Sequence, residues 1–434
     1  MDMKRSKGLK IAVIGAGSTY TPELINGFIV RAGHLSVDSI YLMDINAEKL
    51  KVVAGLAQRM LDANGMNLRL NLTQKLDEAI EGADYVLGQV RVGGLDARIR
   101  DEKIPLKHGL LGQETTGIGG AFKGLRTLPV IMEVARKMEK LAPGAWLINF
   151  SNPSGIIAEA VLNHTGIKML GLCNGPINML KSLPKLVPEG TGKIDYDFVG
   201  LNHLCWITAV YADGREVLRD QLSRNIETSS LKNIPEEAYD EELWKAVKGI
   251  PIGYLNYYYF RDQQVKKCQE AEKTRGEVCK EIEAELLELY KDPKLCEKPA
   301  VLDKRGGALY SEAAVSLIDA IVNDKNEIHV VDVKNNGAFS FMDKNDVIET
   351  KCIVNKDGVT PIKLENFDNY YIIGLMQAVK AYEKLLVKAG LSGDRDALLA
   401  SLMVHPLIGD YYKARAAMEE MLEANRDYLP QFAF

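Results

Sequence analysis

Hydrophobic and polar positions in the first third of the chain alternate between two patterns. Segments with apolar residues spaced near 3.6 predict helices, among them residues 22–31 and 47–63. Short apolar runs rich in β-branched residues predict buried strands at residues 10–14, 39–43, 68–72, 85–90, 146–150 and 168–172. Strands that alternate with helices are typical of a parallel sheet covered on both faces. We therefore expect an α/β fold with a doubly wound, Rossmann-type sheet at its N-terminal end.

The pattern changes after residue 172. Two short strands at residues 196–199 and 207–211 are followed by the turn residues Asp213 and Gly214, which suggests antiparallel pairing. Further strands are expected at residues 328–333 and 347–354, and helices at residues 236–248, 266–290, 366–388 and 394–403. We expect a first domain over residues 1–172 and an α+β domain over residues 173–434.

Composition and charge narrow the class of protein. No apolar run approaches the roughly 20 residues that span a bilayer, and the basic start of the chain lacks the apolar segment of a secretion signal. We expect a cytoplasmic protein without a membrane partner. The net charge of −5 argues against nucleic acid as a partner, although it allows a local basic pocket for one phosphate. Six cysteines without CxxC pairs are expected to be free thiols.

A glycine-rich turn follows the first predicted strand. Gly15, Gly17, Ser18 and Thr19 lie between this strand and a helix for which Thr21 is placed as the cap. At such a turn, glycines let the backbone approach a pyrophosphate that rests on the helix N-terminus. These four residues are candidates for binding a dinucleotide.

The second predicted strand ends at Asp44, whose carboxylate would accept hydrogen bonds from ribose hydroxyls and favour NAD over NADP. Tyr20 replaces the third glycine of the usual motif, so the turn alone is unspecific. The other interpretation is that Gly15 and Gly17 make a tight turn and that Asp44 caps the next helix. The turn, the acidic residue and the alternating pattern together favour NAD.

Several polar segments follow predicted strands at the sheet edge where ligands bind in such folds. Arg98 lies in an arginine-rich segment suited to phosphate or carboxylate, unless it belongs to a solvated helix face. Asn152 would bind sugar hydroxyls or cap a helix. Cys173 and His203 would bind a divalent metal if the fold brings them together, and are otherwise unrelated core residues.

Tyrosines cluster at residues 254–259. Such a run is usually core or interface. A tyrosine acts as a general base only where a nearby cation lowers its pKa from about 10.

These segments together resemble the NAD- and metal-dependent glycoside hydrolases of family 4, most closely their 6-phospho-β-glucosidases. The resemblance runs nearly end to end. Its motifs are Gly-Ala-Gly-Ser at 15–18, residues 91–102, Gly-Gln-Glu-Thr at 112–115, Asn-Pro at 152–153, Cys-Asn-Gly-Pro at 173–176, Asn-His at 202–203, Tyr-Leu-Asn-Tyr-Tyr at 254–258, Thr-Arg at 274–275, Asn-Gly at 336–337 and Asp-Val-Ile-Glu at 346–349.

The resemblance implies hydrolysis by elimination and addition, with NAD+ as a resident cofactor rather than the two carboxylates of most glycosidases. NAD+ takes hydride from C3 of the sugar, a base removes the acidified C2 proton, and the C1–oxygen bond breaks. Water then adds and the retained NADH returns the hydride, so that no net redox change occurs.

By motif match, Cys173 and His203 would hold Mn2+, and Tyr254 would be the base. Arg98 and Arg275 would bind the 6-phosphate of the substrate. Because Tyr257 and Tyr258 are close in sequence, the identity of the base stays open.

By the same match, Asn152 would orient the sugar, and Glu114 would support the metal site or the C3 hydroxyl. Members that cleave α-linked substrates carry Asp after the cysteine, where it can protonate the leaving group. This chain has Asn174 there, which points to β-linked substrates and leaves the general acid unassigned.

We therefore expect hydrolysis of 6-phospho-β-glucosides, such as cellobiose 6-phosphate or a phosphorylated aryl glucoside, by a homodimer or homotetramer. The alternatives are a family 4 enzyme for 6-phospho-α-glucosides or uronides, a 2-hydroxy-acid dehydrogenase with net redox, and an NAD-binding regulatory protein. The expected fold is similar to that of lactate and malate dehydrogenases.

Overall fold

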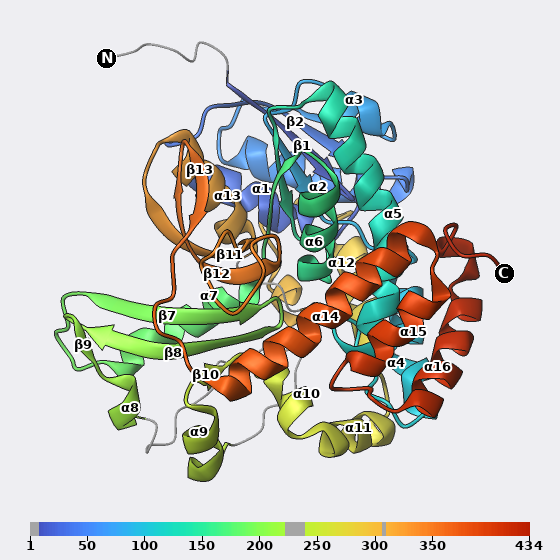
Figure 1. Ribbon diagram of the computed structural model, residues 1–434. Helices are drawn as coiled ribbons and strands as arrows, with labels where there is room; N and C mark the ends of the chain where they lie inside the picture. Colours follow the sequence, from blue (N-terminus) through green and yellow to red (C-terminus); the bar gives the residue numbers. More distant parts are fainter. Residues whose placement is uncertain (1–7, 222–238, 306–309) are drawn as a thin grey trace.

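A six-stranded parallel sheet forms the centre of the N-terminal half (Figure 1). The computed structural model describes residues 8–221, 239–305 and 310–434. The order β3-β2-β1-β4-β5-β6 is the doubly wound Rossmann order, as expected from the sequence. The strands are β1 (Leu9–Ile14), β2 (Val37–Met43), β3 (Leu70–Thr73), β4 (Tyr85–Gly88), β5 (Trp146–Asn149) and β6 (Lys168–Gly171).

Helices cover both faces of this sheet, and the central strands are therefore almost entirely buried. The helices are α1 (Thr21–Val30), α2 (Ala47–Ala63), α3 (Leu76–Ile80), α4 (Gly94–Lys107), α5 (Gly117–Leu141) and α6 (Ser154–His164). Helix α2 has the predicted bounds, because its apolar positions repeat at helical spacing and Asn46 caps it by accepting from Lys49 N.

Strands from the second half of the chain extend the same sheet. β11 (Glu327–Lys334) pairs antiparallel with β6, and β12 (Val347–Asn355) and β13 (Gly358–Pro361) follow, giving nine strands among the described residues. β11 and β12 lie where the sequence predicted strands, at residues 328–333 and 347–354. The division at residue 172 stays a prediction, but the sheet takes its strands from both sides of it.

A second, smaller sheet lies below the first in Figure 1, built around a long hairpin. Its strands are β7 (Ile194–Leu201), β8 (Leu204–Ala212), β9 (Arg215–Glu216) and β10 (Ile250–Pro251), all paired antiparallel. Only Asn202 and His203 connect β7 to β8, so this tight turn fixes the direction of both side chains.

Helices complete the C-terminal half. They are α7 (Asn174–Ser182), α8 (Leu218–Gln221), α9 (Glu241–Val247), α10 (Asn256–Tyr259), α11 (Arg261–Glu270), α12 (Arg275–Leu289), α13 (Tyr310–Val322), α14 (Tyr370–Ser392), α15 (Arg395–Val404) and α16 (Tyr411–Ala424), with 3-10 turns at Leu183–Leu186, Gly253–Leu255, Ala300–Arg305 and Arg426–Tyr428. Helix α9 lies inside the predicted helix 236–248, of which residues 236–238 lie outside the described residues.

Two expectations about helix boundaries are wrong. The stretch 266–290 is not one helix, because α11 ends at Glu270 and α12 starts afresh at Arg275. Thr274 and Glu277 form a capping box that starts α12. Thr21 does not cap α1: it lies in the first turn, and its hydroxyl donates to Ala16 O at 2.8 Å.

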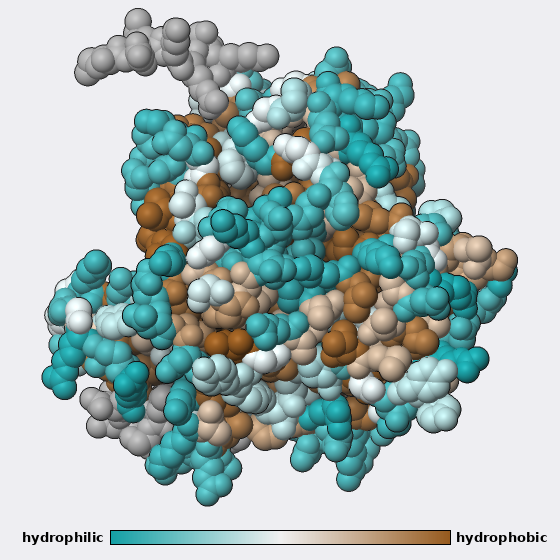
Figure 2. All heavy atoms as spheres, viewed as in Figure 1, coloured by the Kyte–Doolittle hydropathy of each residue, from teal (hydrophilic) through white to brown (hydrophobic). Residues whose placement is uncertain are grey.

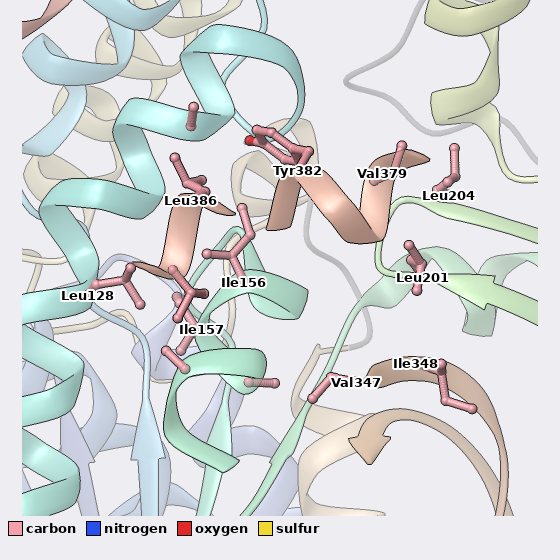
Figure 3. Close-up of a cluster of buried hydrophobic side chains, with 14 of the residues drawn as sticks. Leu128, Ile156, Ile157, Leu201, Leu204, Val347, Ile348, Val379, Tyr382 and Leu386 are labelled. Carbon is pink, nitrogen blue, oxygen red and sulfur yellow. The ribbon is translucent and has the colours of Figure 1, made fainter. Parts of the chain in front are cut away.

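The main core joins α5, α6 and α14. Leu128 of α5, Ile156 of α6 and Leu386 of α14 meet in Figure 3, with Tyr382 close by. Hydrophilic residues cover most of the face shown in Figure 2, interrupted by separate apolar patches. Within the described ranges, no helix combines the length and apolar character needed to cross a membrane.

A buried ion pair ties this core to α4. Arg126 of α5 donates from Nη1 to Asp101 Oδ1 at 2.8 Å and from Nε to Val92 O at 3.0 Å. Both side chains are at most 1% exposed. Burial raises the pKa of Asp101 to about 6, although Arg126 opposes the shift.

Arg126→Met should destabilise the protein by about 3–5 kcal/mol, because it leaves Asp101 buried without its cation. Urea unfolding followed by circular dichroism measures the change. Arg136→Met, at an exposed position of the same helix, is the control and should stay within about 0.5 kcal/mol of the wild type. Equal stability of the two variants would contradict the assigned role of the pair.

Candidate active site

The glycine turn lies between β1 and α1, at the carboxyl edge of the parallel sheet. Gly15 has φ +87°, and a Cβ there would lie 2.9 Å from the backbone of Gln89, so only glycine fits. No side chain caps the start of α1, but Thr21 N already donates to Ser18 O and Pro22 has no N–H. What the turn offers is a backbone without side chains at Gly15 and Gly17, which a ligand can approach closely.

Asp44 closes this turn from the end of β2. Its Oδ2 accepts from Gly17 N at 2.8 Å, and its Oδ1 accepts from Asn46 N at 2.8 Å. The next helix is capped by Asn46, so the alternative in which Asp44 is that cap is wrong. A carboxylate has about four acceptor sites. Both oxygens of Asp44 can therefore still accept ribose hydroxyls.

Residues from the C-terminal half pack against the same turn. The Tyr290 hydroxyl donates to Thr19 O at 2.7 Å, and Arg305 donates to the Thr19 hydroxyl. The Arg305 guanidinium also lies over the Tyr20 ring, 5.0 Å from its centroid. The Thr19 side chain is therefore occupied inside the protein, while Ser18 is only partly buried.

Glu114 lies at the centre of a buried cationic cluster. Its carboxylate contacts Arg91 Nη1 at 2.5 Å, Arg98 Nη1 at 2.9 Å and Lys123 Nζ at 2.8 Å. Burial alone would raise the pKa of Glu114, but the three cations hold it well below its usual value. Burial lowers the pKa of Lys123 to about 7 despite the neighbouring Glu114. The site therefore keeps a permanently ionised carboxylate among several nitrogen donors.

Glu102 joins Arg98 to the backbone at the start of α12, the helix that begins with Arg275. Its Oε1 accepts from Arg98 Nε at 2.8 Å, and its Oε2 accepts from Gly276 N at 2.6 Å, next to Arg275. Arg275 is the first residue of α12 and donates to Lys304 O at 2.8 Å. Helix α4, which carries Arg98, is thus hydrogen-bonded to the start of α12, which carries Arg275, although 177 positions separate the two arginines along the chain.

Cys173 lies at the start of α7, and His203 lies in the turn between β7 and β8. Cys173 caps α7, its Sγ accepting from Gly175 N at 3.3 Å. Burial and the nearby Glu349 raise the pKa of the Cys173 thiol. Burial lowers the pKa of His203 to about 3, so the imidazole is neutral, as a metal ligand must be.

Tyr254 lies against His203. Its ring stacks on the imidazole with centroids 4.1 Å apart. Tyr258 instead bonds Thr116 Oγ1 at 3.0 Å. Burial raises the pKa of Tyr254, so a cation beside it is needed for a phenolate.

The donor set fits an open metal site. His203 Nδ1 and Asn152 Oδ1 are buried without a hydrogen-bond partner in the described part of the chain. Within the same residues, no cluster of three or more His, Cys, Asp and Glu side chains would enclose a metal. If Cys173 and His203 alone held an ion, its other coordination positions would be open to substrate oxygens.

The two asparagines predicted from the sequence lie beside this site. Asn152 is not a helix cap, because α6 begins after Pro153 with no side-chain cap. That alternative role is therefore wrong, and the unpaired Oδ1 faces no competing backbone donor. Asn174 is the half-buried first residue of α7, directly after Cys173.

Sequence reasoning missed Lys123 and Arg305 as parts of the site, and it did not assign Arg91 a specific partner. Lys123 carried a usable signal, since it is a lone cation among glycine and apolar residues at 117–125. Arg305 carried none, because it reaches Thr19 across 286 positions.

Comparisons with known proteins agree with this geometry. The model of the family 4 glycosyl hydrolases matches residues 10–189, and that of the family's C-terminal domain matches residues 198–408. The chain belongs to the family 4 glycosyl hydrolases, which confirms the resemblance inferred from the motifs.

Relatives that cleave different phosphorylated glucosides differ in their sequence identity to this chain. The chain is 41% identical over 436 residues to a probable 6-phospho-beta-glucosidase of Bacillus subtilis (strain 168), covering 98% of each. It is 28% identical over 447 residues to the maltose-6'-phosphate glucosidase of the same organism, again covering 98% of each.

Solved structures agree as well. A 6-phospho-beta glucosidase from Thermotoga maritima with manganese, NAD+ and glucose-6-phosphate has a TM-score of 0.86 and 33% identity, covering 96% of this chain and 98% of that chain. A malate dehydrogenase from Plasmodium falciparum has a TM-score of 0.51 at 13% identity and covers 88% of this chain and 100% of that chain, which confirms the dehydrogenase-like fold alone.

A buried histidine beside the site gives a pH prediction. His405 Nδ1 accepts from Leu407 N at 3.1 Å, so Nε2 carries the proton that faces Thr116 Oγ1 at 3.5 Å. Burial lowers the pKa of His405 from its usual 6.5 to about 3. Between these values the unfolded chain binds a proton that the folded protein does not, so stability falls as pH drops from about 6.5.

His405→Asn should reduce this fall by about 1.4 kcal/mol for each pH unit, and the contribution of the buried His203 should remain. Urea unfolding at pH 7.0, 6.0 and 5.0 measures it, with the exposed His164→Asn as the control. An unchanged slope in His405→Asn would show that His405 is protonated in the folded protein.

Proposed function

We propose that the protein hydrolyses 6-phospho-β-glucosides, with a phosphorylated disaccharide or aryl glucoside as substrate. The observation that carries this proposal is the stacking of Tyr254 on His203, whose buried Nδ1 has no partner among the described residues. An ordinary dehydrogenase has no need of a thiol and an imidazole beside a buried tyrosine. Family membership and the higher identity to the β-specific relative support the substrate class.

NAD+ and Mn2+ are the proposed cofactors. Gly15, Gly17, Ser18, Thr19 and Asp44 would hold NAD+ at the glycine turn. The phosphates would rest on the backbone at the start of α1, and the ribose would bond to the Asp44 carboxylate.

Cys173 and His203 would hold Mn2+, or another divalent ion, next to the sugar. When bound, the two cofactors supply a reversible hydride acceptor and a Lewis acid that stabilises negative charge on sugar oxygens.

The chain's own residues bind and orient the sugar. Arg98 and Arg275 are proposed to bind the 6-phosphate, because guanidinium groups pair with phosphate at two points. Asn152 would present its buried, unpaired Oδ1 to a sugar hydroxyl. Glu114 has a pKa well below its usual value and contacts Arg98, which it would orient. Its carboxylate would also support the metal site or accept a hydrogen bond from the C3 hydroxyl of the sugar.

Tyr254 is proposed to remove the C2 proton. Among the candidate tyrosines 254, 257 and 258, it is the one that stacks on His203. Tyr258 is engaged with Thr116, and Tyr257 is buried. A cation held by Cys173 and His203 would lower the pKa of the Tyr254 phenol from the raised value that burial imposes.

Asn174 supports β-specificity. It stands where an acidic side chain would be needed to protonate the leaving group of an α-linked substrate, and an amide has no such proton. The general acid for the β-linked substrate is left unassigned. We further propose that the enzyme acts in the cytoplasm, as a homodimer or homotetramer.

A substrate panel tests the function. Nitrophenyl 6-phospho-β-glucoside, its α-linked counterpart and the β-glucoside without phosphate are incubated with NAD+ and Mn2+, each omitted in turn. The expected result is hydrolysis of the phosphorylated β-linked compound alone, with both cofactors required and no accumulation of NADH.

The other outcomes are distinct. Comparable cleavage of the α-linked compound would overturn the assigned specificity. Stoichiometric NADH would indicate a dehydrogenase with net redox, and no turnover of any compound would contradict the proposed activity.

Tyr254→Phe should lower kcat by about 10²–10⁴-fold, because it removes the proposed base and keeps the ring on His203. Steady-state kinetics measure kcat, and calorimetry should find glucose 6-phosphate binding unchanged within about twofold. Tyr258→Phe is the control from the same segment. If Tyr258→Phe loses activity while Tyr254→Phe keeps it, the assignment of the base is wrong.

A further inference from the structure

A carboxyl group on β12 holds the turn that carries His203. Glu349 Oε1 accepts from Asn202 Nδ2 at 3.2 Å, and Asn202 Oδ1 accepts from Gly155 N at 3.4 Å. Asn202 therefore bridges β12 and the first turn of α6, and the buried Nδ1 of its neighbour His203 has no partner among the described residues. Glu349 is 1% exposed.

His203 depends on this support because its backbone is held in the left-handed region, with φ +63°. A non-glycine residue adopts that conformation only where its surroundings enforce it. Leu201 and Leu204 fix the two strand ends on either side of the turn (Figure 3). The Asn202 amide anchors the turn itself.

A second carboxyl group performs the same task for the neighbouring segment. Ser154 Oγ donates to Asp332 Oδ2 at 2.6 Å, two residues after Asn152. This bond requires glycine at position 171, since a Cβ there would lie 2.3 Å from Ser154 Oγ and 2.4 Å from Asp332 Oδ2. The Asn152 segment is thus tied to β11 as the His203 turn is tied to β12.

Asp332 and Glu349 stand directly opposite each other in the β11–β12 ladder. Both are buried, and each keeps one oxygen, Asp332 Oδ1 and Glu349 Oε2, without a partner among the described residues. Two adjacent buried anions repel each other strongly. Burial, with the neighbouring carboxyl group, therefore raises the pKa of Glu349, and burial raises the pKa of Asp332 to about 7.

We propose that Glu349 and Asp332 are positioning residues, which hold the Asn202–His203 turn and the Ser154 segment in the geometry that binds the divalent ion and the sugar. Neither carboxyl group needs to touch the ion. The inference rests on the proposed function for the ion itself, and adds the residues that set its affinity. Removal of such an outer support typically weakens metal binding by about 10–100-fold.

The test measures Mn2+ affinity directly. Wild type, Glu349→Ala and Glu349→Gln are loaded with NAD+ and glucose 6-phosphate, and free Mn2+ is followed by electron paramagnetic resonance. Glu349→Ala should bind Mn2+ about 10–100-fold more weakly. Glu349→Gln keeps an acceptor oxygen for Asn202 and should bind within about threefold of wild type.

Ile348→Ala, one residue away in the same buried strand, is the control for general loss of packing. It should lower stability to urea without a change in Mn2+ affinity. If Glu349→Ala does not fold, Asn202→Ala removes the other side of the same bond and should weaken Mn2+ binding by a similar factor.

Each outcome bears on a separate claim. Wild-type affinity in the Ala variants would overturn the positioning role. Weak binding in Glu349→Gln as well would mean that the charge, and not the hydrogen bond, matters, which also contradicts the inference. Failure of the wild type to bind Mn2+ would instead count against the proposed metal site.

Discussion

The antiparallel pairing of β11 with β6 is the contact on which the arrangement of the site depends. It joins a strand from the second half of the chain to the edge of a Rossmann sheet at Asp332 and Gly171, two residues before Cys173. Because β12 follows β11 in register, the same pairing brings Glu349 beneath the β7–β8 turn. Cys173 follows β6 of the dinucleotide fold directly, whereas the turn that carries His203 is held by strands that are remote from that fold in the sequence.

Buried charge is the second organising constraint. Glu114 binds three cations and Glu102 joins Arg98 to the start of α12, so the positive groups of the site are held by carboxylates in the protein without a ligand. Such an arrangement limits the reorganisation that binding requires. The carboxyl pair on β11 and β12 is different, because neither group forms an ion pair with a cation among the described residues. Asp332 instead bonds Ser154, and Glu349 bonds Asn202 in the turn that carries His203.

Local patterns in the sequence predicted the parts of the fold that depend on local physics. The six parallel strands and the bounds of α2 followed from hydrophobic spacing, and the tight turn between β1 and α1 followed from its glycines. The break between α11 and α12 was missed because both segments are charged and helical, and only the capping box at Thr274 separates them. The extension of the sheet by β11–β13 could not be predicted, since strand patterns do not reveal which edge a strand will join.

The assignment of residues to the site from the order of the motifs stays a prediction, and it did not include how these residues are connected. The structure brings Tyr254 onto His203, and Arg98 beside the start of α12, as the motifs implied. The contacts of Lys123 and Glu349 depend on tertiary packing across distant segments, for which the spacing along the chain carries no signal.

The central claim is that NAD serves as an oxidant that is regenerated within each turnover. Hydrolysis of a 6-phospho-β-glucoside in D2O, with the glucose 6-phosphate product examined by nuclear magnetic resonance, tests it most directly. The account predicts solvent deuterium at C2 and retention of the original hydrogen at C3. A product without deuterium at C2 would show that the glycosidic bond is cleaved without removal of that proton, and would contradict the account.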